Sequence, residues 1–182
     1  MRVNKQRMML KYSYLITSFA AVLLLSSCGK IQKLPPEPSI SFRSFEVFDT
    51  TDILGNLTKA GRLKFYFEDG DGDLGIWQQY NGSSSDTVNL FMTLFRKQGN
   101  IVVPAPDDDL LKPTGYRIPY IEKSGQNKIL QGVISVTLFY YFYSPSDTIL
   151  YEFYIKDRAG NLSNTERTCE IIPGKTGICT NK

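Results

Sequence analysis

The feature that most constrains the fold of this chain is an alternation of apolar and polar residues with a period of two. Leu63, Phe65 and Phe67 alternate with Tyr or charged residues, and residues 149–155 carry a similar pattern. Successive side chains of a β-strand point to opposite faces of a sheet, so each such run predicts a strand with one buried face. Further runs predict strands over residues 40–48, 88–95, 133–143 and 165–172, and an edge strand containing Pro119 over 116–121.

These segments amount to about seven strands, separated by turns rich in Gly, Asp, Asn and Pro. Residues 39–182 are therefore expected to form one all-β domain, an immunoglobulin-like two-sheet antiparallel sandwich. Within residues 40–48 the apolar positions change parity near Arg43 and Ser44. A change of parity within one strand predicts a β-bulge or a strand that moves between sheets.

Residues 1–27 have the composition of an export signal, with four basic residues and no acidic one before a charge-free, mostly apolar run over 12–25. That run is shorter than the ~20 apolar residues that a membrane-spanning helix needs. It ends in Leu25-Ser26-Ser27-Cys28, which resembles the lipobox of bacterial lipoprotein precursors. The resemblance implies cleavage before Cys28, attachment of a diacylglycerol to its thiol as a thioether, and a third fatty acyl chain on the freed α-amine, with palmitate among the chains. Residues 28–38 would then be an acylated, proline-rich tether.

The lipobox implies a cell-envelope protein that is anchored to a membrane by lipid. No Asp follows Cys28 and residues 29–32 contain no acidic cluster, which favours the outer membrane, and its periplasmic leaflet over the cell surface. Removal of residues 1–27 changes the net charge from +3 to −1. A nearly neutral mature chain gives no reason to expect a nucleic acid or an anionic membrane surface as a partner.

An acidic loop follows the run that contains Leu63, Phe65 and Phe67. Asp69, Asp71 and Asp73 alternate with glycines, so three carboxylates can reach one point, and such hard oxygen ligands suit Ca²⁺. The loop is not an EF-hand, because Leu74 stands where that motif has Gly and Tyr80 where it has Glu. The alternative interpretation is a solvated Asp-Gly turn without an ion.

Residues 157–164 read Asp-Arg-Ala-Gly-Asn-Leu-Ser-Asn. They resemble the turn between the last two strands of bacterial immunoglobulin-like and cadherin-like domains. As a whole, the chain is similar to a group of lipoproteins that have one such domain and an Asp-Gly-Asp-Gly-Asp turn. In such a sandwich the two turns lie at the same end, so Asp157 and Asn161 could share an ion with Asp71 and Asp73.

Cys169 and Cys179 flank a Pro-Gly turn near the end of the chain. In an oxidising compartment they could form a disulfide, which the sequence favours over two free thiols. Trp77 and Tyr80 lie among amide side chains after the acidic loop, as aromatic residues of sugar-binding surfaces do. The alternative for Trp77 is packing against the end of the sandwich.

The chain contains no histidine, nucleophile elbow, phosphate-binding glycine loop or Cys-x-x-Cys pair, so we expect no enzyme. Paired carboxylates could still support hydrolysis, but residues 69–73 and 107–109 are both interpreted as exposed turns. We therefore expect a non-catalytic binding or structural module with a protein or glycan partner, stabilised by Ca²⁺ if the acidic loop holds an ion. The alternative is a glycan-binding accessory lipoprotein of a sugar-uptake system.

Overall fold

A computed structural model describes residues 34–77, 88–122 and 128–180 of the 182-residue chain. The predicted signal sequence, Cys28, the first part of the tether and Tyr80 lie outside the described residues. Residues Leu34–Lys182 form one compact unit. Its strands are β1 (Ser39–Thr51), β2 (Leu57–Asp69), β3 (Leu90–Gln98), β4 (Ile101–Pro104), β5 (Leu130–Tyr140), β6 (Ile149–Ile155), β7 (Glu166–Arg167) and β8 (Gly177–Thr180).

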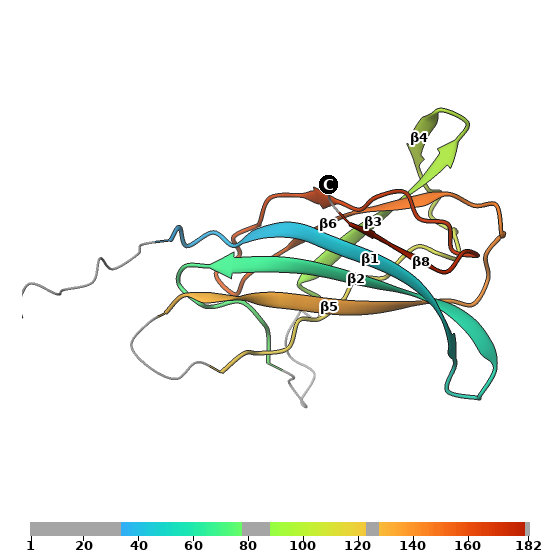
Figure 1. The fold of residues 1–182 in the computed structure, drawn as a ribbon. Coiled ribbons are helices and arrows are strands. Elements are labelled where there is room, and N and C mark those ends of the chain that lie inside the picture. Colours follow the sequence, from blue (N-terminus) through green and yellow to red (C-terminus); the bar gives the residue numbers. More distant parts are fainter. Residues whose placement is uncertain (1–33, 78–87, 123–127, 181–182) are drawn as a thin grey trace, which may run out of the picture. The chain divides into compact units, whose positions relative to one another are not determined.

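The strands form two antiparallel four-stranded sheets, with the orders β5-β2-β1-β8 and β4-β3-β6-β7 (Figure 1). This confirms the prediction of an all-β fold with two sheets. The order matches an immunoglobulin-type sandwich in which β1, β2 and β5 take the places of A, B and E, and β4, β3, β6 and β7 those of C′, C, F and G. Strand β8 is an addition to that scheme.

Two of the described strands were not predicted from the alternation, because β4 and β8 are only four residues long. The edge strand predicted over 116–121 is wrong in detail. That segment makes only isolated bridges, from Tyr116 to Leu90 and from Pro119 to Ile76. No helix of the described residues has the length and hydropathy that crossing a bilayer requires.

The core lies between the two sheets and is built largely from the alternating residues. Phe65 of β2 packs against Phe153 of β6 at a ring-centroid distance of 5.2 Å, and Phe45 of β1 stacks on Tyr151 of β6 at 6.0 Å. All four side chains are almost fully buried. Burial of such a side chain contributes about 1.5–3 kcal/mol, so these contacts hold the two sheets together.

The bulge predicted near Arg43 is present in β1. The register of the β1–β2 pair shifts between Phe42 and Ser44. Phe42 and Phe45 stand three positions apart, which would place them on opposite faces of a regular strand. Both are buried, so the extra residue lets each of them face the core.

Side chains close the part of the β1 edge that precedes the bulge. Strand β8 pairs with β1 only over residues 44–47. Before the bulge, Asn164 accepts from the Ile40 amide at 2.8 Å and donates to the Ile40 carbonyl at 2.9 Å. Glu166 accepts from the Phe42 amide at 3.2 Å. The segment around β7 therefore satisfies backbone groups of the opposite sheet.

Candidate functional site

The acidic loop is folded around the carboxylate of Asp69, the last residue of β2. Asp69 is fully buried, and its side chain accepts hydrogen bonds from the Leu74 amide at 2.7 Å and the Gly72 amide at 3.4 Å. Gly72 has a φ of 71°, which side chains with a Cβ rarely adopt. One carboxylate thus supplies acceptors for a loop that turns too sharply to form a strand ladder.

The chain enters the domain directly against this loop. A Cβ atom at Gly70 would overlap the backbone carbonyl oxygens of Leu34 and Pro35, so only glycine fits there. Strand β1 then runs away from this point to the β1–β2 hairpin, which lies at the other end of the sandwich (Figure 1). Any segment that precedes Leu34 is therefore joined to the acidic end.

The turn between β6 and β7 meets the acidic loop, as expected if both lie at one end of the sandwich. The Asp73 carboxylate accepts from the Ala159 amide at 3.0 Å, and the Asp73 carbonyl accepts from the Arg158 amide at 3.4 Å. The Arg158 guanidinium donates to the carbonyls of Gly75 at 2.8 Å and Leu74 at 3.3 Å. Four hydrogen bonds thus join two loops that are more than 80 residues apart in sequence.

Asp157 and Asn161 bond to each other. Both carboxylate oxygens of Asp157 accept from Asn161, one from its backbone amide and one from its side-chain amide, each at 2.8 Å. The group whose ligand oxygens lie within 4.8 Å of one another consists of Asp69, Asp71 and Asp73. Asp157 does not belong to this group, although its negative charge acts on Asp73.

Burial and charge repulsion make ionisation of Asp69 and Asp73 costly. Burial raises the pKa of Asp69 to about 6, with a further increase from Asp71 and a partial decrease from the Leu74 amide. Burial also raises the pKa of Asp73, as do the negative charges of Asp157 and Asp71. The Arg158 guanidinium and the Ala159 amide lower it only in part.

The spacing of the carboxylate oxygens would allow one metal ion to contact all three residues. Two oxygens that bind one Ca²⁺ at 2.3–2.6 Å can be no more than about 5 Å apart, and the three carboxylates meet that limit. One carboxylate oxygen of Asp73, Oδ1, is buried and has no hydrogen-bond partner among the described residues. A buried carboxylate oxygen without a donor is costly, and a cation would compensate for it.

Trp77 is exposed rather than packed into the end of the sandwich. Its side chain is 62% exposed, and one face of the ring stacks on Tyr120 with centroids 3.7 Å apart. Arg158 also lies over the Tyr120 ring, at 5.0 Å. The sequence indicated neither Tyr120 nor Arg158, because only the fold brings residues 77, 120 and 158 together.

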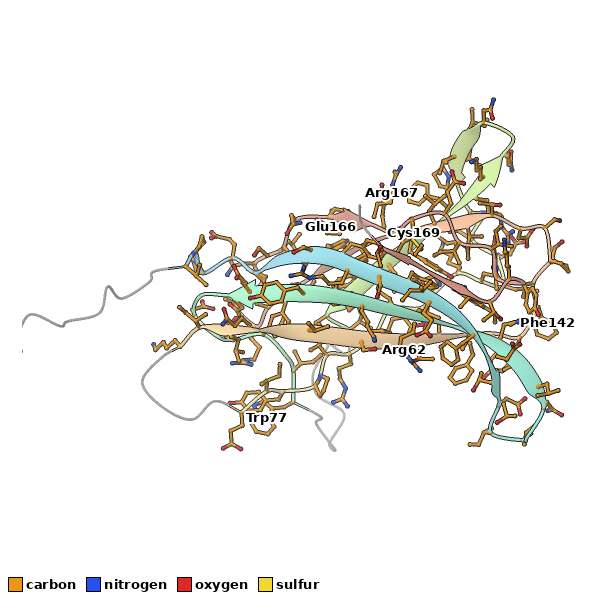
Figure 2. All side chains as sticks on the ribbon, in the orientation of Figure 1. Arg62, Trp77, Phe142, Glu166, Arg167 and Cys169 are labelled. Carbon is orange, nitrogen blue, oxygen red and sulfur yellow. A yellow bond between two sulfur atoms is a disulfide. The ribbon has the colours of Figure 1, made fainter. Side chains whose placement is uncertain are left out.

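A second surface of interest is the β1–β2 hairpin. Asp52 holds its turn, since its carboxylate accepts from the backbone amides of Leu54 and Asn56 at 2.8 Å and from the Asn56 side chain at 3.0 Å. This ordered turn exposes three aliphatic residues: Ile53 is 100%, Leu54 82% and Leu57 88% exposed. Figure 2 shows Phe142, which is 68% exposed, near this hairpin and far from Trp77.

The exposed-turn interpretation of residues 107–109 is wrong for Asp109. Its side chain is only 3% exposed and pairs with Arg96, which also lies 3.0 Å from Asp147. The Arg96 guanidinium lowers the pKa of Asp109. A carboxylate held ionised by arginine is suited to a structural ion pair rather than to general-acid catalysis.

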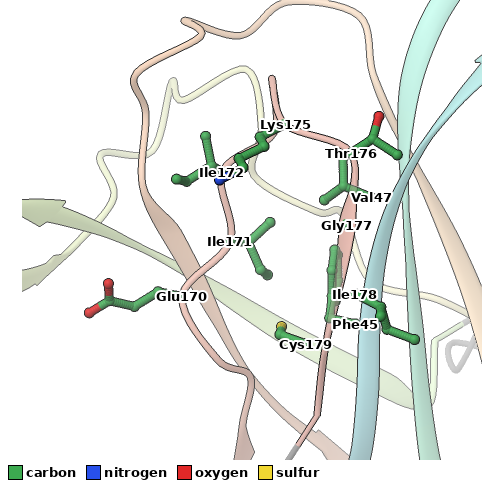
Figure 3. A pocket seen from close by; sticks show the side chains of 10 residues that line it. All are labelled: Phe45, Val47, Glu170, Ile171, Ile172, Lys175, Thr176, Gly177, Ile178 and Cys179. Atoms are coloured by element: carbon green, nitrogen blue, oxygen red, sulfur yellow. The ribbon is translucent and has the colours of Figure 1, made fainter.

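The C-terminal segment is fixed by a disulfide. Cys169 and Cys179 are joined, with their Cα atoms 6.4 Å apart, so that the chain returns to β1 as β8. Beside the bridge lies a pocket of about 160 Å³, with Ile171 in its wall (Figure 3). The charged residues among its lining are Glu170 and Lys175. This largely apolar hollow offers no cluster of chemically reactive groups.

Comparisons with protein-family models, with curated proteins and with solved structures found no match. The function of the chain is therefore inferred from its own residues and their geometry.

The raised pKa of Asp69 predicts a stability that increases on mild acidification. The pKa of an Asp is ~3.9 in the unfolded chain, whereas that of Asp69 is about 6 in the fold. At pH values between these two, the folded chain binds more protons than the unfolded chain. The free energy of unfolding should therefore rise as the pH falls from 7 towards 5, by at most about 1.4 kcal/mol per pH unit for one group.

Urea unfolding without divalent cations at pH 7, 6 and 5 measures this effect. Asp69→Asn is the control, because its oxygen can still accept from Leu74 while its amide no longer titrates. The wild type should gain stability relative to this variant on acidification. Parallel pH profiles for the two proteins would show that Asp69 titrates normally.

Proposed function

We propose that this protein is a lipid-anchored module of the cell envelope that acts by binding a partner rather than by catalysis. The observation that carries this proposal is the difference between the two ends of the domain. Its acidic end receives the chain from Leu34, while the opposite end presents an ordered hairpin with three strongly exposed aliphatic side chains. An anchor at one end and an apolar surface at the other suit a tethered binding module.

The anchor itself rests on Leu25-Ser26-Ser27-Cys28 and the basic and apolar segments before it. One acyl chain holds a protein at a bilayer only marginally, whereas the two or three chains of a lipoprotein cysteine hold it firmly. Extended residues between Cys28 and Ser39 would reach ~30 Å at ~3.1 Å per residue. We place the anchor in the outer membrane, in the periplasmic leaflet.

The hairpin end supports binding because its exposed groups are apolar and preorganised. An ordered loop loses little conformational entropy when a partner covers it. The charged residue of the turn between β1 and β2 is the acidic Asp52, and no basic residue accompanies it there. A turn without basic residues is poorly suited to an anionic bilayer surface, so the proposed partner is a protein.

We further propose that Ca²⁺ binds Asp69, Asp71 and Asp73 and stiffens the anchored end. The ion would neutralise three carboxylates whose mutual repulsion otherwise opposes folding. The orphaned oxygen of Asp73 supports this proposal, because the other oxygen of the same carboxylate already bonds to Ala159. Asp73→Asn keeps an acceptor for Ala159 and replaces the orphaned oxygen with an amide, so this variant is expected to lose the ion.

Mass spectrometry of the protein isolated from its own membranes tests the anchor. The mature chain should begin at Cys28 and carry the mass of two or three acyl chains. Cys28→Ser should leave residues 1–27 attached and remove the acyl mass. A wild-type chain with an unmodified Cys28 would contradict the proposed attachment.

Site-specific photo-crosslinking in cells tests the binding end. A photoreactive residue at Leu54 should give adducts with a discrete envelope protein, because this side chain is 82% exposed on an ordered turn. The matched control is Ser41, which is exposed on β1 near the acidic end and should give none. Adducts at Ser41 alone, or at neither position, would argue against a partner at the hairpin.

Trp77 favours a second candidate function, the binding of a glycan beside a sugar-uptake system. Its ring is 62% exposed, and stacking on Tyr120 holds it in place. Such a ring can pack against the face of a pyranose. Binding in a glycan-array screen that Trp77→Ala abolishes would favour this function over a protein partner.

A further inference from the structure

We propose that two copies of the chain associate through the free edge of β5, so that their β5-β2-β1-β8 sheets join into one continuous sheet. All eleven residues of β5 pair with β2. No described residue forms a backbone hydrogen bond with the other edge of β5. Among the described residues, that edge therefore presents a row of amide and carbonyl groups without a neighbouring strand, although the Tyr140 carbonyl accepts from the Thr58 hydroxyl.

The other sheet edges are short or protected. Strands β8 and β4 are four residues long, and β7 is two residues long. Strand β4 ends in Pro104, and β7 consists of the charged residues Glu166 and Arg167. Before the bulge, the edge of β1 is closed by side chains from the β7 segment. Strand β5 differs from all of these.

Strand β5 lacks the features with which proteins usually prevent edge-to-edge pairing. Its sequence, LQGVISVTLFY, contains no charged residue and no proline. Its pairing with β2 runs without a register shift, whereas the β1–β2 pair has a bulge. On its outer face Val133 is 61% and Phe139 45% exposed. An edge strand that is long, regular, uncharged and partly apolar favours strand addition.

A second copy is the partner that this edge fits best. Donors and acceptors alternate along an antiparallel edge, so the edge is complementary to itself under a two-fold rotation. With the axis at Ser135, Val133 of one copy lies opposite Thr137 of the other. Gln131 then lies opposite Phe139, so no charged residues of β5 face each other.

Charges on the neighbouring strand do not oppose this arrangement. Lys64 of β2 pairs with Ser135, so it lies one strand spacing from β5, the strand beside which the two-fold axis would pass. The two copies of Lys64 would be three strand spacings apart, about 14 Å. This separation exceeds the Debye length of about 8 Å at physiological ionic strength.

Two double substitutions separate this interface from other modes of association. In Val133→Glu/Thr137→Glu, each new acid would face an acid of the other copy, while the acid that replaces Thr137 would lie opposite Arg62 within its own chain. In Val133→Lys/Thr137→Glu, each new base would face a new acid of the other copy. The second variant is thus the matched control, with the same positions charged and the repulsion turned into attraction.

Sedimentation velocity of the full chain in density-matched detergent is the measurement. The wild type should dimerise with a Kd of about 1–100 µM, as expected for a small interface. The Glu/Glu variant should bind at least about tenfold more weakly, because like charges face each other directly. The Lys/Glu variant should return to wild-type affinity, and equal melting temperatures should show that all three proteins are folded.

Hydrogen exchange supplies an independent readout of the same interface. Amide protection in residues 130–140 should increase with protein concentration in the wild type and the Lys/Glu variant, and not in the Glu/Glu variant. The proposal is overturned if the wild type is monomeric up to about 200 µM, well above the expected Kd. It is equally overturned if the Glu/Glu variant dimerises as tightly as the wild type.

Discussion

The organisation of the acidic end of the sandwich depends on a single buried carboxylate. Asp69 terminates β2 inside the protein, where its oxygens accept from the amides of Gly72 and Leu74 and so determine the course of the loop. The position has a cost, because burial and the neighbouring acids raise its pKa to about 6. A proton at low pH or a bound cation at neutral pH would each relieve that cost. The loop is therefore expected to become more stable when the charge of Asp69 is neutralised.

Around this carboxylate the two ends of the sandwich acquire different roles. At one end, Gly70 packs against the incoming chain and Asp73 is bonded to the β6–β7 turn. At the other end, Asp52 orders a turn whose apolar side chains have no cover among the described residues. Acidic residues thus order both loops. In the first loop three of them lie near the point where the chain enters the domain. In the second loop Asp52 orders a turn that exposes hydrophobic side chains. This difference between the two ends is what the proposal of a tethered binding module rests on.

Alternation predicted the long strands well, because each buries one face over many residues. It even located the bulge in β1, where the apolar parity changes near Arg43. It did not predict β4 and β8, which are too short to show a period, and it predicted a strand over 116–121 where only isolated bridges form. The pattern of apolar residues within a segment does not predict whether a short segment pairs as a strand, because that depends on the neighbouring strand.

The sequence also predicted correctly which loops lie together at the site, but it did not predict all of their contacts. The topology of a sandwich was sufficient to place Asp73 near the β6–β7 turn. Side-chain partners could not be derived in the same way, so the bonds between Asp157 and Asn161 were not predicted. Arg158 and Tyr120 were missed, because their importance arises only from contacts between distant segments. Burial of Asp69 was missed for the same reason, as its loop has the composition of a solvated turn.

Calorimetric titration of Ca²⁺ at pH 6 and pH 8, in two buffers with different ionisation enthalpies, tests the central role of Asp69 most directly. With a pKa of about 6, this carboxyl is partly protonated at pH 6 and must release its proton when the ion binds. The account predicts a release of about half a proton at pH 6 and almost none at pH 8, with no binding to Asp73→Asn. Absence of Ca²⁺ binding, or binding with equal proton release at both pH values, would contradict it.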